Sequence, residues 1–239
     1  MNYSWNWSIL VQEPYLGWLG AGLELTLVIS LSAWVLALLV GTLVGIVGTL
    51  PHLFPRALAS IYIGLFRNVP LLLQLFLWFF VVPELLPNDW GHWLKRDLPF
   101  PEFWTSILAL GLFTSARVAV QVGSGITAVS RGQRQAAFAS GMSVAQTYRF
   151  VLLPQAFRIV LPPLTSDFLT VFKNSALALT IGVFELTAQS RQIESFTFQG
   201  FEAFTAATVV YLLIALIVTG FMRTLERRIA LPDAIGARP

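Results

Sequence analysis

The chain has 239 residues, of which 56% are hydrophobic and only 11% are charged. Because soluble globular domains carry about 25% charged residues, this composition indicates an integral membrane protein. The absence of cysteine excludes disulfides, thiolate metal sites and iron–sulfur clusters, and His52 and His92 are too far apart in sequence to indicate a metal site.

The first predicted span follows an aromatic N-terminal region. Residues 1–22 are rich in tryptophan and tyrosine, which favour the membrane–water interface. Residues 25–55 contain no Asp, Glu, Lys or Arg, and their apolar part is long enough to cross a bilayer. Gly41 and Gly45 lie four residues apart, a spacing that permits close contact between helices.

Further spans are predicted within residues 57–83, 103–130 and 203–222, with a polar loop over 84–102. The apolar segment 159–188 is expected to be broken at its proline pair, Pro162-Pro163. We predict one crossing there, followed by a re-entrant or interfacial helix whose irregular backbone is covered by protein or water.

Charge predicts the orientation of these five crossings. With the N-terminus outside and the C-terminus inside, nine cations fall on the inner side and three on the outer side. This asymmetry agrees with the positive-inside rule. The inner cations are Arg56, Arg131, Arg134, Arg149, Arg158, Arg223, Arg227, Arg228 and Arg238, and the outer ones are Lys95, Arg96 and Arg191.

Residues 130–154 form a long polar and basic interruption between two spans. Ser130 is followed three residues later by a glutamine, and Ser143 repeats this pattern, so each is expected to open a short helix with a capping box. Gly141 is expected to end the first helix in the left-handed conformation. Pro154 is expected to end the second helix near Leu153.

The first of these short helices is expected to expose small residues that allow another surface to approach its backbone closely. These residues are Ala136, Ala137, Ala139 and Gly141. A compact helix–turn–helix with a small-residue face, placed between two spans, indicates a docking element for a partner protein.

The docking segment resembles the EAA loop of ABC importer permeases, because Gln135-Ala136-Ala137 is followed by Gly141 and later by Leu153-Pro154. In that family the loop sits in a cleft of the ATP-hydrolysing subunit. Gln135 replaces the usual glutamate, so it can donate and accept hydrogen bonds there but carries no charge. The resemblance implies an ATPase-coupling role for Gln135, Ala136, Ala137, Gly141, Leu153 and Pro154.

Four other segments resemble the polar amino-acid subfamily of these permeases. They are Gly22–Leu27, Phe66–Gln74, Gly111–Ala116 and Lys173–Leu177. The resemblance implies an all-α type I ABC importer permease bundle of about five transmembrane helices. It implies a single permease domain over 1–239, with its core at 22–225.

Arg117 is a charge inside a predicted span, where an unpaired arginine costs about 2.5–3.5 kcal/mol. The subfamily usually has tyrosine there, and an arginine resembles the glutamate/aspartate branch. Phe113, Arg117 and Gln121 recur every four residues, so they share one helix face. With Asp167 they are the candidate substrate-binding residues. Arg117 either binds a substrate carboxylate or pairs with Asp167 or with a carboxylate of a partner chain.

The sequence thus predicts the permease subunit of an ATP-driven importer for polar, and by Arg117 acidic, amino acids in the inner membrane of a prokaryote. No phosphate-binding loop, catalytic residue or cofactor site occurs in it, so ATP and Mg²⁺ are expected in a separate subunit. The resemblance implies two ATP-binding subunits, a second permease (the same chain or another) and an extracytoplasmic solute-binding protein. No nucleic-acid partner is expected.

An ion-coupled secondary amino-acid transporter is the alternative function. Such a protein needs no docking segment, but it needs a carboxylate that binds the coupling ion within the membrane. Asp167 and Glu185 are the candidates for that role.

Overall fold

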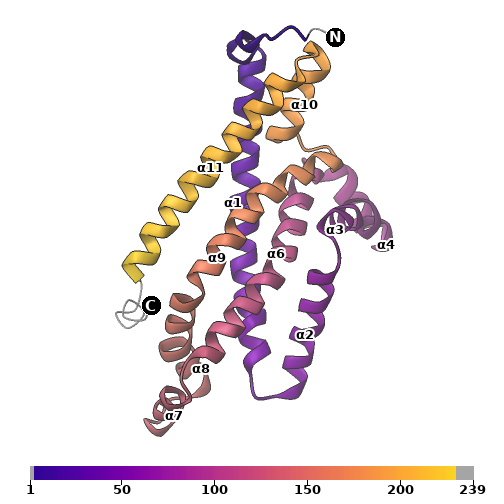
Figure 1. The fold of residues 1–239 in the computed structure, drawn as a ribbon. Coiled ribbons are helices and arrows are strands. Elements are labelled where there is room, and N and C mark those ends of the chain that lie inside the picture. Colours follow the sequence, from indigo (N-terminus) through magenta and orange to yellow (C-terminus); the bar gives the residue numbers. More distant parts are fainter. Residues whose placement is uncertain (1–2, 230–239) are drawn as a thin grey trace. The chain divides into compact units, whose positions relative to one another are not determined.

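The computed structural model describes residues 3–229, and every regular element within them is a helix (Figure 1). The predicted all-α class is therefore confirmed. In chain order the elements are η1 (Trp7–Val11), α1 (Tyr15–Thr49), α2 (Leu53–Asn68), α3 (Leu71–Phe76), η2 (Leu77–Val81), α4 (Val82–Leu85), α5 (Asn88–His92), η3 (Trp93–Asp97), α6 (Pro101–Ala128), α7 (Arg131–Ala139), α8 (Val144–Thr147), η4 (Tyr148–Leu152), α9 (Leu153–Ser175), η5 (Ala176–Ile181), α10 (Leu186–Thr197) and α11 (Gly200–Ile229).

The helices form two compact units. Unit 1 contains the residues up to Leu36 together with Val69–Leu112 and Leu169–Ile217. Unit 2 contains Ala37–Asn68, Phe113–Phe168 and the residues from Val218 onward. The four long helices α1, α6, α9 and α11 each contribute residues to both units.

Within residues 3–229, three helices are long and apolar enough to cross a membrane: α1, α6 and most of α11. Two bent helix pairs raise this number to five if each pair counts as one span. One pair joins α2 to the helices that follow it, and the other joins Val144–Ile181 to α10. About five spans were predicted, and the structure agrees; the sides on which the termini lie remain a prediction.

Proline acts differently from the sequence expectation in unit 2. Pro154 does not end a helix, because α8 continues through the π-helical turn η4 directly into α9. The Leu153 N–H bonds the carbonyl of Tyr148, five residues back, and Pro154 then occupies the first turn of α9, where a missing N–H is tolerated. The pair Pro162-Pro163 likewise lies inside α9 and does not break it.

Two other boundaries also differ from the expectation. The predicted second span is a pair of helices, since α2 ends at Asn68, and Pro70 disfavours the helical conformation of the residue before it. Residues 84–102 were predicted as a loop, but they contain α5 and the π-helical turn η3. The region 159–188 does end in the start of a separate helix, α10. Gly182 adopts a φ of 96° before this helix, and α10 is bent by 51° from the helical segment Val144–Ile181.

The close helix contact predicted at Gly41 and Gly45 is present in unit 2, between α1 and α6. A Cβ on Gly41 would lie 2.6 Å from the Ser115 carbonyl oxygen, and one on Gly45 would lie 2.8 Å from that of Ala119. Any larger residue would push the two backbones apart. This contact fixes which face of α6 points to α1, and therefore leaves Arg117 on the opposite face.

Candidate functional site

Arg117 and Asp167 form an ion pair in unit 2. The Arg117 Nε donates to Asp167 Oδ1 at 2.7 Å, across 50 residues of sequence. The Asp167 side chain is 1% exposed, whereas that of Arg117 is 44% exposed. The contact predicted as one of the two alternatives therefore exists.

The helix that carries Arg117 is a regular α-helix from Pro101 to Ala128. Phe113, Arg117 and Gln121 consequently share one face, as their spacing predicted. Phe113 and Gln121 are half-buried beside the exposed guanidinium. Thr114, Ser115 and Ala116, which precede the arginine, are buried.

Asp167 lies on a buried apolar stripe of α9. Val160 and Leu164, seven and three residues earlier, are almost fully buried on the same side of the helix. The Asp167 Oδ2 atom is buried and has no hydrogen-bond partner among the described residues. A carboxylate in such surroundings depends on its one cation, because removing the partner of a buried charge leaves the desolvation cost uncompensated.

The ion pair engages only one edge of the guanidinium. Within the described residues, no hydrogen bond or ion pair involves the terminal Nη atoms of Arg117. A guanidinium has five N–H donors and can bind a carboxylate in a bidentate manner through its two terminal nitrogens. Asp167 therefore anchors Arg117 and still leaves that edge open to a second anion.

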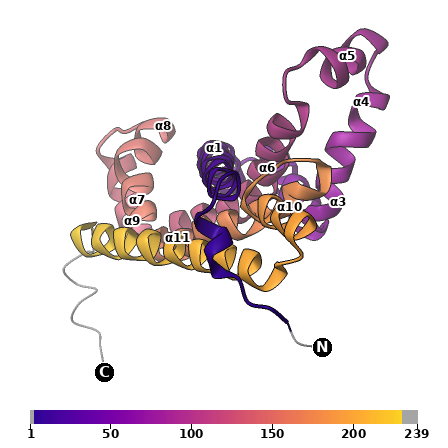
Figure 2. The same ribbon diagram turned by 90° about the horizontal axis from the view of Figure 1, so that it is seen from above.

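The docking segment, 130–154, is built as a capped helix–turn–helix (Figures 1 and 2). Ser130 Oγ accepts from the Gln133 N–H, and Ser143 forms the complete capping box with Gln146. Gly141 has a φ of 80°, and the N–H groups of Gly141 and Met142 bond the carbonyls of Phe138 and Ala137. These bonds form a Schellman motif and confirm the predicted end of α7. At Ser130, the bond from the Gln133 N–H is present, but the second hydrogen bond of the predicted capping box is not.

A tyrosine attaches this segment to the end of α1 within unit 2. The Tyr148 hydroxyl donates to the Thr49 carbonyl at 3.0 Å and lies 3.1 Å from the Thr49 hydroxyl. Tyr148 and Thr147 are both buried. A displacement of the docking segment would therefore be transmitted directly to the last turn of a membrane-spanning helix.

The small residues of α7 divide between two faces. Ala136, Ala139 and Gly141 are exposed, as predicted, but Ala137 is only 6% exposed. Ala137 is small because α7 packs there against the rest of its own unit, so it does not belong to the exposed face. Of the remaining predicted coupling residues, Gln135 and Pro154 are exposed and Leu153 is half-buried.

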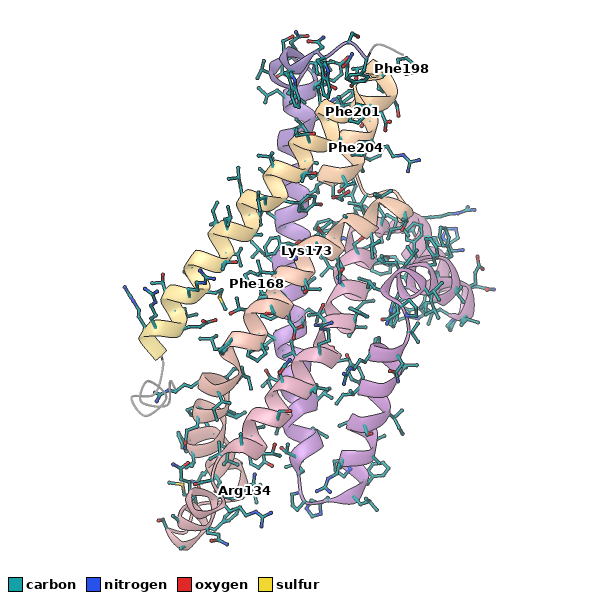
Figure 3. All side chains as sticks on the ribbon, in the orientation of Figure 1. Arg134, Phe168, Lys173, Phe198, Phe201 and Phe204 are labelled. Carbon is teal, nitrogen blue, oxygen red and sulfur yellow. The ribbon has the colours of Figure 1, made fainter. Side chains whose placement is uncertain are left out.

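The outward face of α7 carries larger side chains that the motif comparison missed. Arg131, Gln135 and Phe138 are all exposed, and their spacing of four and three residues places them on one stripe opposite Ala137. Arg134, on the same helix, is half-buried (Figure 3). The spacing of four and three residues between the stripe positions was the signal available in the sequence.

Glu185, a candidate ion-coupling residue, is used as a helix cap in unit 1. Its carboxylate oxygens accept from the backbone N–H groups of Thr187 and Ala188, at 3.0 and 2.9 Å, and from the Tyr211 hydroxyl at 2.7 Å. The side chain is fully buried at the start of α10. Three donors therefore already occupy the carboxylate.

Unit 1 also contains an apolar cavity of about 440 Å³. Aromatic side chains including Trp78, Phe79 and Trp104 line it, and none of the predicted site residues does. No group of three or more His, Cys, Asp or Glu residues that could hold a metal ion occurs within residues 3–229.

A family model described as the binding-protein-dependent transport system inner membrane component matches residues 37–231. The chain belongs to this family. With its several candidate spans, it is a multi-span protein of the inner membrane.

Proteins that resemble the chain along its length include amino-acid permeases. The glutamate/aspartate import permease protein GltJ of Escherichia coli K12 is 43% identical over 246 residues, covering 100% of both chains. The glutamine transport system permease protein GlnP of the same strain is 30% identical, covering 93% of this chain and 97% of its own.

Two solved structures share the fold of this family member. A crystal structure of an amino acid ABC transporter with histidines matches with a TM-score of 0.78 and 29% identity, covering 95% of this chain and 100% of the other. The inward-facing MetNI methionine ABC transporter matches with a TM-score of 0.76 and 18% identity, covering 92% and 100%. The predicted ABC importer permease fold is confirmed.

Proposed function

We propose that this permease imports glutamate and aspartate as one subunit of an ATP-driven transporter. The full-length similarity to a glutamate/aspartate permease supports the acidic substrates. The observation that carries the proposal is Arg117, a membrane-helix cation whose terminal nitrogens are open to a substrate carboxylate.

Asp167 positions Arg117 for that contact. Because Asp167 accepts from Nε, it restrains the arginine side chain, and neither terminal nitrogen of Arg117 makes a hydrogen bond within the described residues. A pre-positioned donor loses less conformational entropy when the substrate binds than a free side chain would. Phe113 and Gln121, one turn before and after Arg117, supply an apolar surface and an amide on the same face.

ATP and Mg²⁺ bind to a separate subunit, since the chain has no phosphate-binding loop. The docking segment transmits the movement of that subunit to the spans through η4 and α1. Alternating access then exposes Arg117 to each side of the membrane in turn, and the substrate shifts this equilibrium only by its different affinity for the two states. A second permease subunit, identical or different, and an extracytoplasmic solute-binding protein complete the importer.

A secondary transporter is less well supported. Glu185 already accepts three hydrogen bonds, and Asp167 already has Arg117 as its cation. The similar proteins include permeases of ABC transporters.

Substrate competition tests the proposed substrate. Cells that lack their own acidic amino-acid uptake and express this permease with its partner subunits would be given labelled glutamate. We expect unlabelled aspartate to compete strongly, and glutamine, histidine and arginine to compete weakly. Equal competition by glutamine would contradict an acidic substrate, because an amide does not form a charged pair with Arg117.

A further inference from the structure

None of the residues assigned to transport or docking lines the apolar cavity of unit 1. The cavity is lined by η2 and α4, by η3, and by the first turns of α6. Its volume of about 440 Å³ lies within the range of about 300–1,000 Å³ that is typical of ligand-binding cavities. Lys95 is the one charged group among the described residues that line it, and most of the others are aromatic or aliphatic. A ligand of this cavity is therefore mainly apolar.

A polar pocket of about 320 Å³ adjoins this cavity, since Pro83 and Lys95 line both. It is formed by α4, α5 and η3, and α4 and α5 lie side by side (Figure 2). Gly91 permits this close packing, because a Cβ at that position would lie 2.2 Å from the Pro83 carbonyl oxygen. The polar side chains of this pocket are Glu84, Asn88, His92, Lys95 and Arg96. The two pockets together form a site that is apolar at one end and charged at the other.

The charged end of this site has cationic donors to spare. Lys95 Nζ pairs with Glu84 Oε1, and His92 Nδ1 lies 3.6 Å from Asp97 Oδ2. Arg96 is exposed and makes no hydrogen bond or ion pair among the described residues. Lys95 also keeps further N–H donors, because an ammonium group has three. An anion such as a phosphate could therefore accept charge-assisted hydrogen bonds from both side chains.

Three exposed tryptophans belong to the elements that form the two pockets. Trp90 lies on α5, Trp93 in η3 and Trp104 at the start of α6. Tryptophan is enriched at the membrane–water interface, the depth at which lipid headgroups lie. An apolar cavity that continues into a cationic pocket at this depth matches an amphiphile with a phosphate headgroup.

We propose that this site binds a glycerophospholipid, with one acyl chain in the apolar cavity and the phosphate between Lys95 and Arg96. The inference goes beyond the proposed transport function, because an acidic amino acid is too polar for the cavity. The acyl chain contacts η2, η3 and α6 at once, so a bound lipid holds the hairpin of α4 and α5 against the start of α6.

Photolabelling of the assembled transporter in nanodiscs tests the lipid site. The probe is phosphatidylethanolamine with a photoactivatable diazirine in one acyl chain, and mass spectrometry identifies the labelled residues. We expect labelling within residues 78–108, and we expect Arg96→Glu to lower it on the order of tenfold, because a charged hydrogen bond to the phosphate is lost. Leu94→Trp, which fills part of the cavity, should lower labelling without a change of charge. Arg191→Glu, an equal charge change at an exposed position that lines neither pocket, is the matched control and should be labelled as wild type is.

A diacylglycerol probe with the same chains and diazirine but no phosphate separates the contribution of the headgroup from that of the chain. It should label the same residues on the order of tenfold more weakly, and equal labelling by both probes would overturn the phosphate contact. Labelling of wild type that neither Arg96→Glu nor Leu94→Trp lowers would mean nonspecific boundary lipid and would overturn the site. If an amine-reactive reagent cross-links Lys95 to a partner subunit and no lipid labels these residues, a protein covers the cavity and the proposal is wrong.

Discussion

At the scale of single residues, the ion pair between Arg117 and Asp167 serves both stability and the proposed substrate binding. Asp167 is fully buried on an apolar stripe, and Arg117 is its cation. Breaking a buried pair by removing one partner costs about 3–5 kcal/mol, because the remaining charge stays buried. The same arginine is proposed to bind the substrate, so a single substitution there changes both stability and transport.

A double substitution separates these two effects. We expect Arg117→Tyr alone to lower the yield and thermal stability of the complex, and Arg117→Tyr/Asp167→Asn to restore much of both. Glutamate affinity of the double variant should remain reduced by roughly ten- to a hundredfold, as expected when a charged hydrogen bond worth about 1.5–3 kcal/mol is lost. Thermal unfolding and uptake kinetics of the three proteins measure the two properties.

Asp167→Asn alone is the control, since it keeps an oxygen that accepts from Arg117 Nε. A double variant that assembles normally and imports glutamate with wild-type affinity would limit the pair to a structural role.

The sequence predicted Arg117 and Asp167 as candidates, because a charge inside an apolar span is conspicuous in any sequence. It left their contact open, since periodicity relates positions within one helix and cannot relate two helices 50 residues apart. For Ala137, the sequence could not predict which way the residue faces. The motif identifies it as small, but only the packing of α7 decides that this small residue faces inward.

At the scale of elements, helix caps and close contacts were predictable, and the effect of proline was not. Ser143 and Gly141 fulfil their predicted roles, because capping depends on neighbours in sequence. Pro154 and the pair Pro162-Pro163 do not end helices. A π-helical turn accommodates Pro154, and the hydrogen-bonding geometry that allows this depends on the surrounding helices.

The contact between α1 and α6 gives a prediction at this scale. Gly41→Leu would place side-chain atoms against the Ser115 carbonyl and Val118, whose nearest atoms lie 2.6 Å from the position of a new Cβ. We expect this overpacking to cost about 1–3 kcal/mol or more and to lower the unfolding temperature of the purified permease.

Gly64→Leu on α2 is the matched control, because no heavy atom lies within 4 Å of its added Cβ. If both leucine variants unfolded at the wild-type temperature, the close approach of α1 and α6 at Gly41 would be refuted.

At the scale of the whole molecule, the charge distribution predicts the topology. Reporter domains fused after Asp89, after Gly132 and at the C-terminus should lie outside, inside and inside, because nine cations against three favour that orientation. The two bent helix pairs each count as one crossing in this topology. Activity of a C-terminal reporter on the outer side would mean that one of these pairs does not cross the membrane exactly once.

The central claim is that this permease imports acidic amino acids with energy from ATP hydrolysed by another subunit. Its most direct test is glutamate uptake into proteoliposomes that contain the permease subunits and the ATPase subunit, with the solute-binding protein outside and ATP trapped inside. We expect glutamate to accumulate only when hydrolysable ATP is present, regardless of any sodium or proton gradient. Accumulation driven by an ion gradient in the absence of ATP would contradict the account.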